Sequence, residues 1–129
     1  MIVNISSASG STKFEADTVT FSEDKQWDFS VLSFIGVFKN KIKNGGIYAL
    51  STNMIERDDG NAYRTINFLY IDNDSYKIIF TPTQKMRYKL RFHDLSNTVF
   101  NLRSIRTNEI IVFSEIAFQL EIRETYGRF

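Results

Sequence analysis

The sequence predicts an all-β protein, an antiparallel two-sheet sandwich of about eight short strands. Apolar and polar residues alternate with a period of two in one segment after another, as they do in strands with one buried face. Turn-forming residues separate these segments about every 8–12 residues, a spacing typical of sandwiches and barrels. The 3.6-residue period of an amphipathic helix is hard to find, so we expect no more than a helical turn in 50–60 or 92–97.

The clearest alternation lies in 116–124, "IAFQLEIRE". One side carries Ile116, Phe118, Leu120 and Ile122, and the other carries Ala117, Gln119, Glu121 and Arg123. Burying four large apolar side chains contributes on the order of 6–12 kcal/mol, before the loss of chain entropy is counted. We therefore expect the Ile116 side to face the opposite sheet. A shift in the apolar phase near Ser114 and Glu115 predicts a β-bulge there.

Segment 26–38, "QWDFSVLSFIGVF", carries apolar residues on both sides of a predicted strand, so its second half should be buried on both faces. One side carries Trp27, Phe29, Val31, Ile35 and Val37, and the other carries Leu32, Phe34 and Phe38. Shorter alternating segments predict the remaining strands: 1–5, 16–21, 45–53, 62–71, 76–80, 87–92 and 98–105.

Two turns are marked by their residue types. The "DNDS" segment, 72–75, favours a tight turn because Asp and Asn tolerate left-handed backbone. It predicts that 76–80 returns as the second strand of a hairpin, which Pro82 then ends because it lacks an N–H for the ladder. The second turn is "RTNE", 106–109.

The length of 129 residues suits a single domain. We expect one β-sandwich domain over 16–129, preceded by a flexible N-terminal arm over 1–15. The arm is predicted from the small and polar residues of "SSASGST", 6–12.

The composition excludes several classes of protein. The net charge is +1 and the chain has no cysteine, so disulfides and Cys-based metal sites are excluded, and the sequence gives no specific nucleic-acid signal. No apolar stretch approaches the roughly 20 residues of a membrane span, and the N-terminus lacks the features of a secretion signal. A cytosolic or virion-interior location is therefore the default expectation.

Residues with catalytic potential are few. The lone histidine, His93, stands beside Asp94 and would serve as a general base or simply occupy a polar loop, and we favour the loop. The acidic loop 56–61, "ERDDGN", would bind a cation through Glu56, Asp58 and Asp59, although its spacing fits no EF-hand. We favour an ordinary polar turn there. No phosphate-binding loop or nucleophile motif is present, so we expect no enzyme activity, no cofactor and no metal.

Two groups of residues form the predicted interaction surface. The first group, Lys39, Lys41 and Lys43, would share one face of a strand and would either contact a partner or protect an edge from aggregation. The second group, Gln119, Glu121 and Arg123, lies on the polar face of the last strand. That face would meet either solvent or another protein.

The chain resembles the single jelly-roll proteins of double-stranded DNA viruses and polinton-like elements, of the penton or minor capsid type. The resemblance rests on "WDFSVLSF", 27–34, after a variable N-terminus, and on 88–124, where a polar loop, a short hairpin and a long alternating strand follow one another. In that family a Gly commonly occupies the turn that is "RTNE" here.

The resemblance implies a single jelly roll and a non-enzymatic virion component that acts by self-assembly, at a capsid vertex, a minor capsid position or a spike. Its partners would be further copies of itself and other capsid proteins. Its location would be the virion, or the host cytoplasm or nucleus during assembly. The alternative from the residues themselves is a β-sandwich module that binds a small ligand or a carbohydrate. A third interpretation, a β-sandwich hydrolase with scattered carboxylates, is less favoured.

Overall fold

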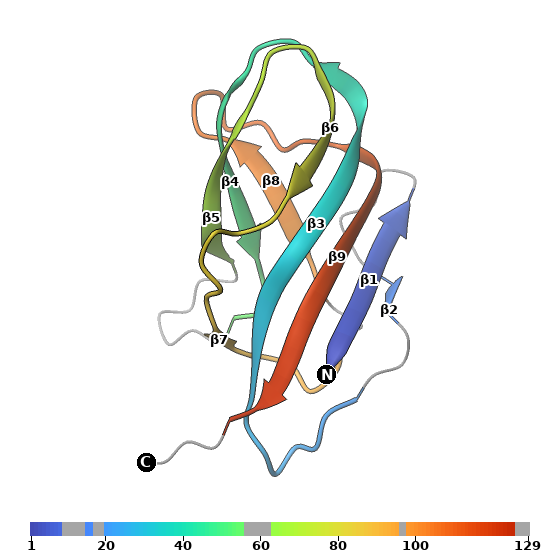
Figure 1. The fold of residues 1–129 in the computed structure, drawn as a ribbon, viewed down its shortest axis with the longest axis vertical. Helices are drawn as coiled ribbons and strands as arrows, with labels where there is room; N and C mark the ends of the chain where they lie inside the picture. The colour runs from blue at the N-terminus through green and yellow to red at the C-terminus, as the bar shows by residue number, and fades with distance from the viewer. Residues whose placement is uncertain (9–14, 17–19, 56–62, 96–97, 126–129) are drawn as a thin grey trace.

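The structure is a computed structural model that describes residues 1–8, 15–16, 20–55, 63–95 and 98–125. Strands account for all the regular secondary structure in these ranges, and no helix occurs in them. The strands are β1 (Ile2–Ala8), β2 (Glu15–Ala16), β3 (Trp27–Ile42), β4 (Gly46–Thr52), β5 (Arg64–Ile71), β6 (Ser75–Phe80), β7 (Tyr88–Lys89), β8 (Phe100–Ser104) and β9 (Phe113–Glu124) (Figure 1).

The strands form two antiparallel sheets. The larger sheet has the order β2-β1-β9-β3-β6, and β7 also pairs with β3. The smaller sheet has the order β5-β4-β8. In Figure 1 the long strands β3 and β9 run side by side across one layer, with β4 and β8 in the layer behind them. The predicted all-β, two-sheet sandwich is confirmed.

Several of the strand pairs are nested along the chain, although the pair of β4 with β8 crosses that of β3 with β6. The outermost pair joins β1 to β9, the next places Thr20 beside Asp94, and the inner pairs join β3 to β6 and β4 to β5. Such nesting results when a long antiparallel hairpin folds over a core. It also explains why the first and last strands of the chain are neighbours in one sheet.

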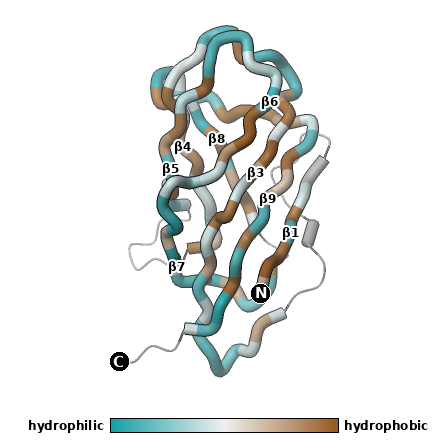
Figure 2. The backbone as a smooth tube through the Cα atoms, viewed as in Figure 1, coloured by the Kyte–Doolittle hydropathy of each residue, from teal (hydrophilic) through white to brown (hydrophobic). Residues whose placement is uncertain are grey.

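Stacked phenylalanines link the two sheets. The ring of Phe118 on β9 lies 4.0 Å from that of Phe100 on β8 and 4.9 Å from that of Phe34 on β3, measured between centroids. All three side chains are buried. Figure 2 shows the alternation of hydrophobic and hydrophilic residues along β3 and β9 that gives each strand one buried side. The predicted inward side of β9 is confirmed, because Ile116, Phe118, Leu120 and Ile122 are all buried.

Two bulges interrupt the pairing of β3 with β9. Val37 pairs with Glu115 and Phe38 pairs with Phe113, which leaves Ser114 as the extra residue and confirms the predicted bulge. A second irregularity lies on β3 itself, at Leu32, which has no partner in the register.

The Leu32 irregularity corrects the predicted burial of β3. Because a bulge adds one residue, it reverses which side of the strand each later residue occupies. Phe34 and Phe38 therefore point into the core, whereas Ile35 is 51% exposed on the outer face. The prediction that Ile35 shares a side with Phe29, and that both faces are buried, was wrong.

The predicted hairpin of 62–71 and 76–80 was also wrong. β5 pairs with β4 in the smaller sheet, whereas β6 pairs with β3 in the larger one. The turn at 72–75 is present, with Asp74 at a φ of 62°. It carries the chain from the smaller sheet to the larger one. The Asp74 amide donates a hydrogen bond to the Ile42 carbonyl at 2.6 Å, so the turn is joined to the end of β3 and not to β5.

The segment expected to be an N-terminal arm begins with a strand. Residues 2–8 form β1 and pair with β9 from Ile2 to Ala8. Val3 and Ile5 are buried in the core, so the sandwich includes residues that we assigned to the arm. Residues 9–14 lie outside the described residues.

Gly36 on β3 gives a direct test of this packing. A Cβ at Gly36 would lie 2.5 Å from Cε1 of Phe113, far inside van der Waals contact. We therefore expect Gly36→Ala to lower the free energy of unfolding by about 1–3 kcal/mol, as overpacking does in other cores. The matched control is Gly46→Ala, where a Cβ would meet nothing within 4 Å. Urea unfolding should separate the two variants, and equal midpoints would contradict the packing described.

Candidate functional site

The outer face of the smaller sheet gathers large apolar side chains in solvent. The register places Ile47 beside Tyr70 and Ala49 beside Phe68. The amide of Ile105 donates a hydrogen bond to the Ile47 carbonyl at 3.1 Å, which extends the first row across a third segment. The exposed Ile47, Phe68, Tyr70 and Ile105, together with Ala49, which is only 7% exposed, are called the apolar face below.

Local sequence explains why these side chains point outward. In β4 and β5 the alternate residues Tyr48, Leu50 and Leu69 are buried in the core. Their neighbours must therefore project from the opposite side of the sheet. Phe68 is 65% exposed, Tyr70 66%, and Ile47 and Ile105 55% each.

The apolar face is about as large as the largest apolar patch on a typical monomer. A fully exposed Phe or Tyr side chain presents about 200 Å², so Phe68 and Tyr70 together present roughly 250 Å² at the exposures given above. The two isoleucines bring the total to on the order of 450 Å², within the range at which exposed patches on monomers are often functional. Two rows of residues cross the face: Tyr70, Ile47 and Ile105 form the first, and Phe68, Ala49 and Arg103 form the second. Arg103 is the charged side chain in these rows.

The predicted lysine group lies at the end of β3. All three lysines are exposed. Lys41 forms an ion pair with Asp74 at 3.3 Å, and its ammonium lies 5.6 Å from the centre of the Tyr76 ring. Lys41 and Lys43 line a hollow in the surface of about 520 Å³, to which Lys39 does not contribute.

The predicted β9 group is built around one carboxylate. Glu121 accepts a hydrogen bond from Arg87 at 2.7 Å, forms an ion pair with Lys85, and lies 3.9 Å from Nε of Arg123. Gln119 and Glu121 are half-buried and Arg123 is exposed. Because Glu121 pairs with Ser30 near the start of β3, the two predicted groups occupy opposite ends of the larger sheet and form no common surface.

The Glu121 contacts predict a pH effect on stability. The hydrogen bond from Lys85, aided by the charges of Lys85 and Arg87, lowers the pKa of Glu121 below its ordinary 4.5, although burial opposes this. A carboxyl with a lowered folded-state pKa contributes stability above the unfolded value and loses it as the pH falls through the folded one.

We expect the urea midpoint of the native sequence to fall as the pH drops below 4.5. The Glu121→Gln variant should lose less over the same interval, since it lacks this titrating contact. Parallel losses in the two proteins would show that Glu121 contributes nothing to the acid sensitivity.

Among the described residues, His93 is part of no cluster of possible metal ligands. His93 is exposed, and its backbone carbonyl accepts a hydrogen bond from the Phe21 amide at 2.7 Å. In the described ranges, no three His, Asp or Glu side chains are grouped as metal ligands would be. Residues 56–62, which include the acidic loop, lie outside the described residues.

Sequence reasoning missed the apolar face. The alternation of 62–71 and 45–53 was visible, and it placed Phe68 and Tyr70 on one side of a strand. The sequence does not give the register between strands, which sets Ile47 and Ile105 beside the two aromatic residues. The available signal was an aromatic pair, Phe68 and Tyr70, that alternates with the apolar Leu69 and Ile71.

The described strands form an antiparallel two-sheet β-sandwich whose smaller sheet carries exposed apolar side chains on its outer face. No protein-family model, curated protein or solved structure matches the chain. In the described part of the chain there is no helix long and apolar enough to cross a membrane.

Proposed function

We propose that this protein is a non-enzymatic structural component that acts by self-association, with the apolar face as the contact between copies. The single observation that carries this proposal is the exposed patch of Phe68, Tyr70, Ile47 and Ile105 on the smaller sheet. Exposing such a patch to water is unfavourable by about 25 cal/mol per Å². A second copy would cover it.

The size of the patch fits a two-fold contact. A standard interface buries about 800 Å² on each partner, slightly more than half of it apolar. The apolar face supplies on the order of 450 Å², so a polar rim of similar area would complete such a footprint. Aromatic residues are enriched, and most charged residues depleted, at the centre of interfaces. The composition of the apolar face agrees with both trends.

The resemblance to single jelly-roll capsid proteins gives this self-association a biological setting. We propose a viral or virus-like structural role, at a capsid vertex, a minor capsid position or a spike. The antiparallel two-sheet sandwich supports the proposal, since it is the broader architecture to which single jelly rolls belong. Other capsid proteins would contact the remaining surfaces, including the β9 group around Glu121.

Sedimentation equilibrium of the full chain tests the proposal. Over roughly 1–500 µM we expect reversible association to a defined oligomer, in the affinity range of interfaces of this size. The association should persist at 0.5 M salt, because apolar contacts are not screened as charge contacts are. A monomer at every concentration would contradict the proposed function.

A further inference from the structure

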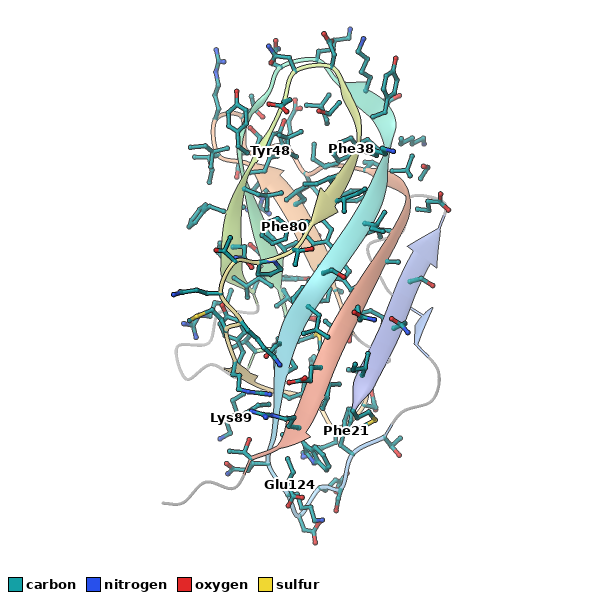
Figure 3. The ribbon with its side chains drawn as sticks, viewed as in Figure 1. Phe21, Phe38, Tyr48, Phe80, Lys89 and Glu124 are labelled. Carbon is teal, nitrogen blue, oxygen red and sulfur yellow. The ribbon has the colours of Figure 1, made fainter. Side chains whose placement is uncertain are left out.

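A second feature of the molecule is the hollow at one end of the sandwich, which adjoins the apolar face at Ile47. Two segments far apart in the sequence form its walls. The first runs from Lys41, at the end of β3, through the following turn to Gly46, and the second is the loop from Arg106 to Val112 before β9. Both segments lie at the upper end of the molecule in Figure 1, and Tyr48 is labelled near the same end in Figure 3. The volume of about 520 Å³ is within the range of small-molecule sites.

Backbone hydrogen bonds hold both walls in place. The Lys39 amide donates to the Val112 carbonyl at 2.9 Å, and the Ser104 amide donates to the Glu109 carbonyl at 2.9 Å. On the other wall, the Gly45 amide donates to Oδ1 of Asn73. The hollow is therefore a product of the fold and not of long side chains on a flat surface.

The lining of the hollow is cationic at its rim. It contains Lys41, Lys43 and Arg106 against a single carboxylate, Glu109. Lys41 is already paired with Asp74. Among the described residues, no ion pair includes Lys43 or Arg106. Two cations from opposite walls are thus available to an anion.

The inner part of the hollow combines apolar and hydrogen-bonding groups. Ile42 and Tyr48 are both buried. Burial, followed by the charge of Glu109, raises the pKa of Tyr48. Its hydroxyl is protonated at neutral pH, as any tyrosine hydroxyl is, and can donate a hydrogen bond. The Glu109 carboxylate is an acceptor on the same side. These groups suit a ligand that carries hydroxyls as well as an anionic group.

We propose that this hollow binds a phosphate-bearing small molecule, with the phosphate between Lys43 and Arg106 and the hydroxyl-bearing part over Tyr48 and Glu109. Arg and Lys are the side chains that proteins use most for phosphate, Arg through two parallel hydrogen bonds and Lys as a point charge. The inference does not depend on the proposed self-association, and it extends the small-ligand alternative to a named site and ligand class.

Titration of the ¹⁵N-labelled full chain with ribose 5-phosphate tests the proposal. We expect amide shifts concentrated in 41–48 and 104–112, weaker binding of inorganic phosphate, and no binding of ribose. Lys43→Ala and Arg106→Ala should each weaken the binding of ribose 5-phosphate about tenfold or more, as expected for losing one charge-assisted contact.

The matched control is Lys25→Ala, at the opposite end of the sandwich, where Lys25 pairs with Glu124. It should bind ribose 5-phosphate as the native sequence does. Thermal melts confirm that each variant folds. The proposal would be overturned by shifts spread evenly over all basic surfaces, by equal binding of ribose, or by native affinity in the Lys43 and Arg106 variants.

Discussion

Replacing Phe118 with Ala should lower the free energy of unfolding by about 3–5 kcal/mol, the usual cost of removing a fully buried aromatic ring. Phe118 is 1% exposed, and its ring stacks on Phe34 within its own sheet and on Phe100 in the opposite one. The substitution removes the contact between the two layers and leaves a cavity that neighbouring rings fill only in part. This loss is a large share of the 5–15 kcal/mol typical of a domain.

Urea unfolding followed by fluorescence measures this effect. The chain has a single tryptophan, Trp27, which packs against Phe21 at 5.3 Å and reports on the fold. The matched control is Phe68→Ala, the same substitution at a side chain that is 65% exposed. It should change the stability of the monomer by less than about 0.5 kcal/mol. Similar losses in both variants would contradict the placement of the core.

The double variant Phe68→Glu with Tyr70→Glu should weaken self-association at least about 100-fold. Aromatic side chains at the centre of an interface each contribute about 2 kcal/mol or more, and tenfold in affinity corresponds to 1.4 kcal/mol. The new carboxylates would also have to be buried without partners, which adds a desolvation cost. Sedimentation equilibrium gives the dissociation constant directly.

The larger sheet supplies a matched control for this variant. Tyr76 and Ile79 on β6 are 66% and 67% exposed, close to the values for Tyr70 and Phe68. Tyr76→Glu with Ile79→Glu adds the same charge to the opposite layer and should leave the association unchanged. If this control dissociates the oligomer and the Phe68/Tyr70 variant does not, the contact lies on the larger sheet.

Local alternation was enough to predict the fold class. Phe118 and its neighbours on β9 were placed correctly because their pattern has a period of two without interruption. The bulge at Ser114 was also predicted, since the apolar phase shifts visibly there. The bulge at Leu32 was missed although Ser33 stands where the alternation of Phe29 and Val31 calls for an apolar residue, because Ile35 and Val37 resume the same apolar phase.

The pairing of strands that are far apart in the sequence could not be predicted from local patterns. The turn at 72–75 was recognised, but a turn sequence does not state whether the next strand stays in the same sheet. β6 crosses to β3 because its inward residues Ile78 and Phe80 pack against the core from the larger sheet. The apolar face was missed for the same reason, since it arises from register between three segments.

The candidate site residues illustrate the same limit. Lys41 and Glu121 were correctly placed on strands and at or near the surface, but their partners, Asp74 and Lys85, come from distant segments. No pattern in the sequence indicates that the two groups lie at opposite ends of one sheet.

A dilution series of backbone amide spectra of the ¹⁵N-labelled protein tests most directly whether the apolar face is the contact between copies. It locates the contact without altering any side chain. We predict concentration-dependent shifts confined to β4, β5, β8 and the adjoining Ile105, centred on Phe68 and Tyr70. Shifts centred on the outer face of β3, β6 and β9, or no shifts up to millimolar protein, would contradict this assignment.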